Sequence, residues 1–229
     1  MKPPRFDYVR ADGAAEAAAL LQQVGDEARI LAGGQSLMAV LNMRLAQPAL
    51  LVDISRSTAL SGVRVEGAAL RVDAAATQAS VEWRPQLASE VPLLAQAFPH
   101  ISHFQIRNRG TVCGSIAHAD PSAELPLVLL ALRGEVLLCS ARRQRKVAAA
   151  EFFTGMLSTA RRPDELVEAV RFPLAVPGTG YAFAEFSQRH GDFAVCAVAA
   201  CVDARGIRLA VGGVADRPTA RDWPLLDGS

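Results

Sequence analysis

The chain has 229 residues, enough for one large domain or two small ones, and 51% of them are hydrophobic, which is ample for a packed core. The 24 basic residues and 23 acidic residues leave a net charge of +1, which excludes a bulk field that attracts nucleic acid or an anionic membrane. We therefore expect partners to be recognised by shape and local chemistry.

The N-terminus and the cysteines indicate a cytoplasmic protein. Residues 1–8 lack the apolar core of a signal peptide, and no apolar run is long enough to span a bilayer. The four cysteines show no C-x-x-C pairing, which argues against a zinc site or an iron–sulfur cluster bound by this chain. We expect Cys139, Cys196 and Cys201 to be buried, reduced thiols.

The first sixty residues predict a β-α-β-α-β unit. Its elements are a strand at 6–9, a helix at 13–24, a strand at 29–32, a helix at 37–45 and a strand at 49–54. Asp12 is placed to cap the first helix.

Gly33 and Gly34 lie between a predicted strand and a predicted helix. Ser36 stands where it caps that helix, so the first N–H groups of the helix point at the turn and no side chain keeps a phosphate from the backbone. A glycine pair between a strand and a helix also occurs in ordinary turns, so this motif alone does not establish an anion site. Residues 107–115, RNRGTVCGS, again place glycines beside hydroxyl residues. Two such loops favour a site that clasps one dinucleotide.

The middle of the chain predicts two hairpins around a helical region. The predicted elements are a hairpin of 60–66 and 69–74, short helices between 77 and 98 interrupted at Pro85 and Pro92, a helix at 122–132 ended by Gly134, a hairpin of 135–141 and 146–149, and a strand at 165–172. The basic run 142–145 invites a phosphate-binding interpretation, but it lacks interleaved aromatic residues, so we interpret it as a solvated turn.

Two prolines and two glycines between 173 and 180 mark a boundary. Beyond it, the segments 181–187, 193–202 and 206–214 predict a three-stranded antiparallel meander.

Three separated motifs occur in the order found in a known family. They are AGGQSLMAVLNMRLAQP at 32–48, QIRNRGTVCGSIAHADPSAELP at 105–126 and FSQRHGDFA at 186–194. Together they resemble the medium, FAD-binding subunit of molybdenum hydroxylases, the group that includes carbon monoxide, xanthine and nicotine dehydrogenases. The resemblance spans nearly the whole chain and is specific for fold and cofactor, but it says little about substrate.

The resemblance implies an α+β protein with the two-subdomain, PCMH-type FAD-binding fold. We expect subdomain 1 at 1–56, subdomain 2 at 57–173 and a short antiparallel C-terminal sheet at 174–229. Members of the family usually carry a helical bundle after this sheet, and this chain stops at Ser229, so we expect an edge or face of the sheet to be exposed or covered by another subunit.

The resemblance also implies the cofactor-binding residues. The backbone of 32–36 holds the pyrophosphate of FAD, the turn 111–115 covers it, and Glu124 accepts hydrogen bonds from the adenosine ribose, unless it is a surface charge at a helix start. Related flavoproteins attach FAD through a histidine where this chain has Gln35, so we expect non-covalent binding. The full set of expected cofactor-binding residues is Leu31, Ala32, Gly33, Gly34, Gln35, Ser36, Ile101, Thr111, Val112, Gly114, Ser115, Asp120, Glu124, Arg161, Phe183 and Glu185.

Several of these residues have a second interpretation. Ile101 and Phe183 fall where the family contacts the cofactor, but both suit core packing, and Asp120 suits a turn before Pro121. Glu185 lies on the strand that approaches the flavin ring, where it either contacts the cofactor or is a solvated surface residue.

Two positions depart from the family. Cys113 stands where the family normally has glycine, and we expect the thiol near the cofactor to be either a harmless substitution or a redox-sensitive one. Arg161 stands where the family usually has leucine or isoleucine over the edge of the flavin ring. Either the alignment of this chain with the family slips by one residue here, or a cation lies near the flavin ring. The four dispersed histidines do not have the spacing of a metal site, and we assign no catalytic or metal-binding residue to this chain.

The family implies a flavoprotein subunit of a heterotrimeric, cytoplasmic oxidoreductase. A large subunit carries the molybdenum cofactor, a small subunit carries two [2Fe–2S] clusters that reduce this FAD, and a dimer of heterotrimers is one candidate assembly. Two alternatives stay open at this point: a self-sufficient FAD-dependent oxidoreductase, and a scaffold subunit that has lost FAD.

Overall fold

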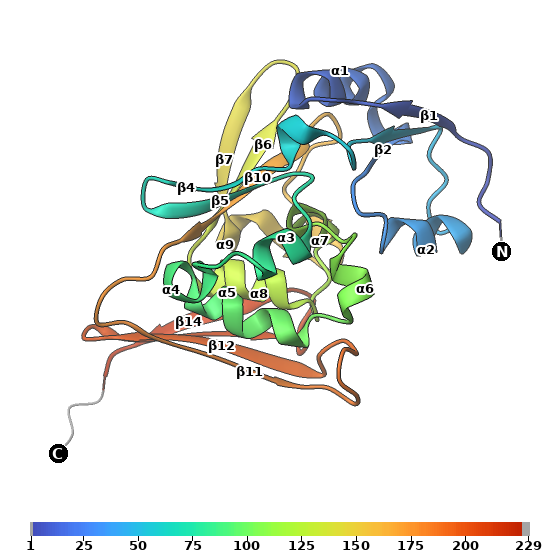
Figure 1. The fold of residues 1–229 in the computed structure, drawn as a ribbon. Coiled ribbons are helices and arrows are strands. Elements are labelled where there is room, and N and C mark those ends of the chain that lie inside the picture. Colours follow the sequence, from blue (N-terminus) through green and yellow to red (C-terminus); the bar gives the residue numbers. More distant parts are fainter. Residues whose placement is uncertain (1, 226–229) are drawn as a thin grey trace.

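The computed structural model describes residues 2–225, in which short helices connect three main sheets (Figure 1). The N-terminal unit contains β1 (Asp7–Arg10), α1 (Ala14–Val24), the 3-10 helix η1 (Gly25–Glu27), β2 (Ala28–Leu31), α2 (Leu37–Asn42) and β3 (Leu50–Asp53). Its strands are parallel in the order β1-β3-β2. The predicted β-α-β-α-β unit is confirmed.

Both helix caps predicted for this unit are wrong. Gly13 occupies the N-cap position of α1, and the Asp12 backbone N–H donates instead to Glu16 Oε2 at 2.9 Å. Ser36 makes no capping bond, because its φ of −88° and ψ of −45° are already helical, whereas a capping residue has an extended backbone.

The middle region forms a five-stranded antiparallel sheet in the order β4-β5-β10-β6-β7. Its strands are β4 (Val63–Glu66), β5 (Ala69–Asp73), β6 (Glu135–Cys139), β7 (Gln144–Ala148) and β10 (Leu166–Pro173), and a small hairpin joins β8 (Phe153–Gly155) to β9 (Ser158–Thr159). Both predicted hairpins and the closing strand are confirmed within a few residues.

The middle region also contains several short helices, of which α7 and α9 pack on this sheet. They are η2 (Thr58–Leu60), α3 (Gln78–Glu82), α4 (Leu87–Glu90), α5 (Pro92–Ala97), η3 (Phe98–His100), α6 (Phe104–Arg107), α7 (Val112–His118), α8 (Glu124–Ala131) and α9 (Ala149–Phe152). Pro92 occupies the first turn of α5, where its missing N–H costs nothing. The predicted interruptions between 77 and 98 are therefore confirmed.

Helix α8 is the centre of the larger core. All eight of its residues are buried, and it packs against α5 and α7. Burying one of its leucines contributes about 1.5–3 kcal/mol. A glycine follows its last turn as predicted: the Gly134 N–H donates to Leu129 O at 2.8 Å.

The C-terminal sheet has four strands, not the three that we predicted. They are β11 (Gly180–Phe186), β12 (Cys196–Asp203), β13 (Gly206–Gly212) and β14 (Thr219–Trp223), paired antiparallel in chain order. The sequence TARDW of β14 has too little apolar alternation to predict a strand, and its pairing with β13, through Ala210 and Ala220, makes it one.

One face of this sheet packs against α5 and α8, which lie between it and the five-stranded sheet (Figure 1). Ala197, Ala199 and Ala210 are buried on that face. Phe186 and Trp223 are exposed on the opposite face. Domain boundaries after residues 56 and 173 stay a prediction.

The interpretation of the basic run as a solvated turn is wrong for Arg145. This residue lies in β7 and donates from Nε to Glu165 Oε1 at 2.6 Å and from Nη2 to Glu165 Oε2 at 2.8 Å. Glu165 is only 2% exposed and the Arg145 side chain 27%, so the ion pair is partly buried at the edge of the sheet.

Candidate functional site

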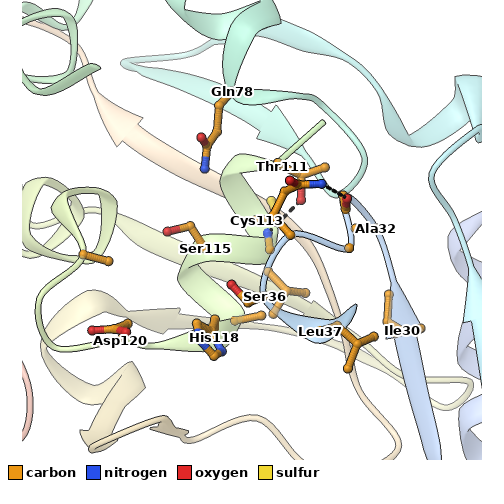
Figure 2. Close-up of a pocket in the computed structure, with 18 of the residues that line it drawn as sticks. Ile30, Ala32, Ser36, Leu37, Gln78, Thr111, Cys113, Ser115, His118 and Asp120 are labelled. Atoms are coloured by element: carbon orange, nitrogen blue, oxygen red, sulfur yellow. Dashed lines mark hydrogen bonds between the residues drawn. The ribbon is translucent and has the colours of Figure 1, made fainter. Parts of the chain in front are cut away.

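A cavity of about 650 Å³ lies where the N-terminal unit meets the helices of the middle region. The first glycine turn forms one wall, and α7 with the turn before it forms another. Figure 2 shows Ala32 and Ser36 from the first turn, with Thr111 and Ser115 from the second, around this space. The two motifs singled out in the sequence therefore line one site.

The two glycine turns are in direct contact. A Cβ on Gly33 would lie 2.7 Å from Gly110 Cα and closer still to the Arg109 carbonyl oxygen, so only glycine allows this approach. Gly34 has a φ of +72°, which also favours glycine. Gln35 Nε2 donates to Gly33 O at 2.9 Å, which fixes the turn from inside.

The second turn is held by α3 and by its own threonine. Thr111 Oγ1 accepts a hydrogen bond from the Gly114 N–H at 3.0 Å, so it caps α7. The Gln78 N–H donates to Gly110 O at 2.7 Å, and Thr77 and Thr111 form an isolated β-bridge. The backbone of this turn is therefore fixed before any ligand enters.

Cys113 lines the cavity, but its thiol donates to Val72 O at 3.4 Å. Burial, with the nearby charge of Asp73, strongly raises the pKa of this thiol. A protonated, buried thiol is a poor nucleophile, so Cys113 fits at this position as a small packed side chain.

Twelve of the sixteen expected cofactor-binding residues line the large cavity: Ala32, Gly33, Gly34, Gln35, Ser36, Ile101, Thr111, Gly114, Ser115, Asp120, Glu124 and Arg161. Leu31 instead lines a second cavity, of about 490 Å³, that shares the first glycine turn. Val112 is fully buried in the core, and neither Phe183 nor Glu185 lines the large cavity. The Phe183 ring packs against the His100 ring, with centroids 5.2 Å apart.

Glu124 is not a surface charge. It is 6% exposed at the start of α8, and burial raises the pKa of its carboxyl to about 7, with Glu185 and Asp120 acting in the same direction. Burial also raises the pKa of Glu185, whose Oε2 is buried without a hydrogen-bond partner. The cavity wall thus holds a carboxyl whose ionisation is easily changed by a ligand.

Asp120 and Ile101 have the structural roles given above and also line the cavity. Asp120 Oδ1 accepts from the Ser122 N–H at 2.9 Å, as a turn former does, and the residue also lines the cavity. Ile101 belongs to the core and lines the cavity as well.

Arg161 lines the cavity, so a cation does lie there. Its Nη1 donates to the carbonyl oxygens of Arg162 and Glu165, each at 2.8 Å. Burial, followed by the neighbouring charge of Arg29, lowers the pKa of this guanidinium.

Sequence reasoning missed several residues of the cavity: Ile30, Leu37, Gln78, His118 and Phe193. Ile30 and Leu37 flank the first turn, and Phe193 belongs to the third motif, so their positions were detectable signals. Gln78 carried no signal, because a glutamine near a helix start is usually solvent-exposed.

Residues 4–175 match the family model described as the FAD binding domain in molybdopterin dehydrogenase. The chain belongs to this family. This FAD-binding domain is 44% identical to the 6-hydroxypseudooxynicotine dehydrogenase complex subunit alpha of Paenarthrobacter nicotinovorans, over 88% of this chain and 68% of that one. It is 39% identical to the caffeine dehydrogenase subunit beta of Pseudomonas sp. (strain CBB1), over 91% and 71% of the two chains.

Solved structures of family members share the fold. Carbon monoxide dehydrogenase from Hydrogenophaga pseudoflava superposes with a TM-score of 0.91 and 35% identity, over 96% of this chain and 78% of that one. Quinoline 2-oxidoreductase from Pseudomonas putida 86 gives a TM-score of 0.90 at 33% identity, again over 96% and 78%. The α+β, FAD-binding fold of a molybdenum hydroxylase medium subunit is confirmed.

The residues present fit FAD, the cofactor of this family. Both glycine turns line the cavity, and the hydroxyl residues Ser36, Thr111 and Ser115 line it beside them, as donors that a diphosphate can use. The cavity is also lined by the side chain of Gln78 and by the carboxyls of Asp120 and Glu124, which can accept hydrogen bonds from ligand hydroxyls. Among residues 2–225, no cluster of histidine, cysteine and carboxylate side chains is suited to a metal ion, and no helix has the length and apolar character needed to cross a membrane.

Proposed function

We propose that this chain is the FAD-binding electron-transfer subunit of a molybdenum-containing hydroxylase. In this role it takes electrons from [2Fe–2S] clusters of a partner subunit and passes them to an external acceptor. The observation that carries the proposal is the contact between the two glycine turns over one cavity of about 650 Å³. A large molybdenum-cofactor subunit and a small iron–sulfur subunit are the partners, and names such as medium chain and complex subunit among the relatives support such an assembly.

The residues of the two turns bind and orient the cofactor without covalent attachment. The backbone of 32–36 holds the diphosphate, and Ser115 and the Thr111 hydroxyl donate to it from the opposite side. Glu124, once ionised, accepts two hydrogen bonds from the ribose hydroxyls. Bound FAD exchanges electrons one at a time or in pairs, which is the chemistry that links iron–sulfur clusters to a two-electron acceptor.

Other residues that line the cavity control what reaches the isoalloxazine ring of FAD. Ile101 and Phe193 offer apolar surface, which excludes water, and Arg161 supplies a fixed positive charge in a partly desolvated place. A cation there favours an additional electron on any ligand that it faces. The cytoplasmic location and the dimer of heterotrimers stay predictions.

Anaerobic flavin absorbance tests the proposal. The purified chain should contain FAD and show no loss of flavin absorbance when the substrate of the complex is added. The assembled complex, with its metal centres loaded, should lose flavin absorbance when the same substrate is added. Rapid bleaching of the isolated chain would overturn the relay in favour of a self-sufficient oxidoreductase, and a folded chain that binds no FAD would leave only a scaffold.

A further inference from the structure

The second cavity, of about 490 Å³, borders the first glycine turn and is formed mainly by the N-terminal unit. It shares only residues 32–35 with the cavity assigned to FAD. Its volume lies within the range of about 300–1,000 Å³ that small-molecule sites occupy. The cavity is therefore large enough for a small ligand of its own.

This cavity lies at the carboxyl ends of the three parallel strands. Arg10 is the last residue of β1, Leu31 of β2 and Asp53 of β3, and all three line the cavity. In open sheets of parallel strands, ligands bind beyond this end of the strands. The topology of the N-terminal unit thus places the second cavity where ligand binding is typical.

Three arginines line the second cavity, namely Arg10, Arg56 and Arg109, and none of them lines the first one. Arg10 Nη2 lies 3.9 Å from Asp12 Oδ1, which is too far for a hydrogen bond. Within residues 2–225, neither Arg56 nor Arg109 forms an ion pair. The guanidinium groups therefore keep donors that no carboxylate of this chain uses.

The acidic residue that lines this cavity, Asp53, does not neutralise the three charges. It is buried, and its two carboxylate oxygens already accept hydrogen bonds from the Tyr8 hydroxyl and from the Ser55 N–H, the latter at 2.7 Å. The hydrogen bond to the carboxylate raises the pKa of the Tyr8 hydroxyl, whereas the charges of Arg10 and Arg56 lower it, so both charges act inside the cavity. A concave space with an excess of positive charge attracts anions.

A guanidinium group binds phosphate oxygens through paired N–H donors, and several of them around one space favour a group with more than one negative charge. We infer that the second cavity binds a phosphate-bearing small molecule, such as a nucleotide, whose phosphate oxygens accept hydrogen bonds from Arg10, Arg56 and Arg109. The exposed side chains of Tyr8 and Met38 offer apolar surface to the organic part of this ligand. The ligand binds in addition to FAD, so the inference goes beyond the proposed function.

The test titrates the FAD-loaded chain with inorganic pyrophosphate and with ADP, followed by calorimetry at constant ionic strength. We expect one saturable site per chain for each probe. Arg56→Met removes one guanidinium, so the dissociation constant of both probes should rise about ten- to hundredfold, the loss of hydrogen bonds to a charged group. Flavin absorbance per chain should stay that of the wild type, because Arg56 does not line the first cavity.

Arg205→Met is the matched control. Arg205 is almost fully exposed and pairs with Asp203 at the turn between β12 and β13, so this variant should bind both probes as the wild type does. If Arg56→Met does not fold, Arg10→Met takes its place with the same expected result. Equal affinity for the two probes supports recognition of the phosphates alone, and tighter binding of ADP supports an added contact with the nucleoside.

Three results overturn the inference and leave the proposed function intact. One is the absence of saturable binding of either probe at millimolar concentrations, which leaves the arginines to an acidic surface of another chain. Another is unchanged affinity in folded variants of Arg56 and Arg10. The third is binding that occurs only in the FAD-free chain, because the probes then occupy the first cavity.

Discussion

The buried carboxyl of Glu124 makes the stability of the FAD-free chain depend on pH. Burial, supported by Glu185 and Asp120, raises the pKa of Glu124 from 4.5 to about 7 in the folded state. Between these values the folded protein holds a proton that the unfolded chain releases. The associated stability is fully present below pH 4.5 and is lost as the pH rises to about 7.

The size of this effect follows from the two pKa values. A difference between 4.5 and about 7 corresponds to about 3 kcal/mol of unfolding free energy. Glu124→Gln is neutral at every pH and should remove this dependence. From pH 5 to pH 8, the unfolding free energy of the variant relative to that of the wild type should therefore rise by about 2–3 kcal/mol, measured by urea unfolding of FAD-free protein. The exposed Glu151→Gln should behave as the wild type. If wild type and Glu124→Gln unfold with the same pH dependence, the carboxyl is not buried as described.

The affinity for FAD should depend on the ionisation of Glu124 with the opposite sign, rising with pH where the stability of the FAD-free chain falls. If ribose hydroxyls donate to an ionised Glu124, binding favours loss of the proton, and the affinity of the wild type should rise up to tenfold per pH unit below about pH 7. The affinity of Glu124→Gln should be flat over this range. A pH-independent wild type would refute the ribose contact.

Two further substitutions test the contacts around the cavity. Gly33→Ala places a methyl group 2.7 Å from Gly110 Cα, so the turns must separate and flavin absorbance per chain should fall sharply, whereas Gly13→Ala has open space and should retain it. Arg145→Met removes two of the three hydrogen bonds to the buried Glu165 carboxylate, which keeps only the Arg162 N–H, and should lower the unfolding free energy in urea by about 1–3 kcal/mol. A loss below 1 kcal/mol would mean that the ion pair is screened by water.

The parts of the fold that follow from local signals were predictable. Apolar periodicity and glycine turns gave the β-α-β-α-β unit, and the leucine-rich run gave α8. Strand β14 was missed because its identity comes from pairing with β13 rather than from its own composition. The cap at Ser36 was wrong because residue type does not determine the φ and ψ that a cap requires.

The candidate site was predictable where a motif marked it and not where packing made it. The glycines and hydroxyl residues of both turns were identified from the sequence. Gln78 was not, because only the tertiary structure shows that its amide is buried without a partner. The ion pair of Arg145 with Glu165 joins residues twenty positions apart, and no local pattern indicates such a pair.

The shape of the cavity depends on contacts between regions rather than on either turn alone. Gly33 packs against the backbone of Gly110, and the carbonyl of Gly110 is in turn held by the Gln78 N–H. The N-terminal unit, the second turn and α3 are thus joined in one series of backbone contacts. Because close-packed interiors transmit small displacements, a change at any of these three positions alters the other two. Affinity for a cofactor at this site is therefore a property of the interface between the regions, and substitutions at Gly33 and Gln78 should not be additive.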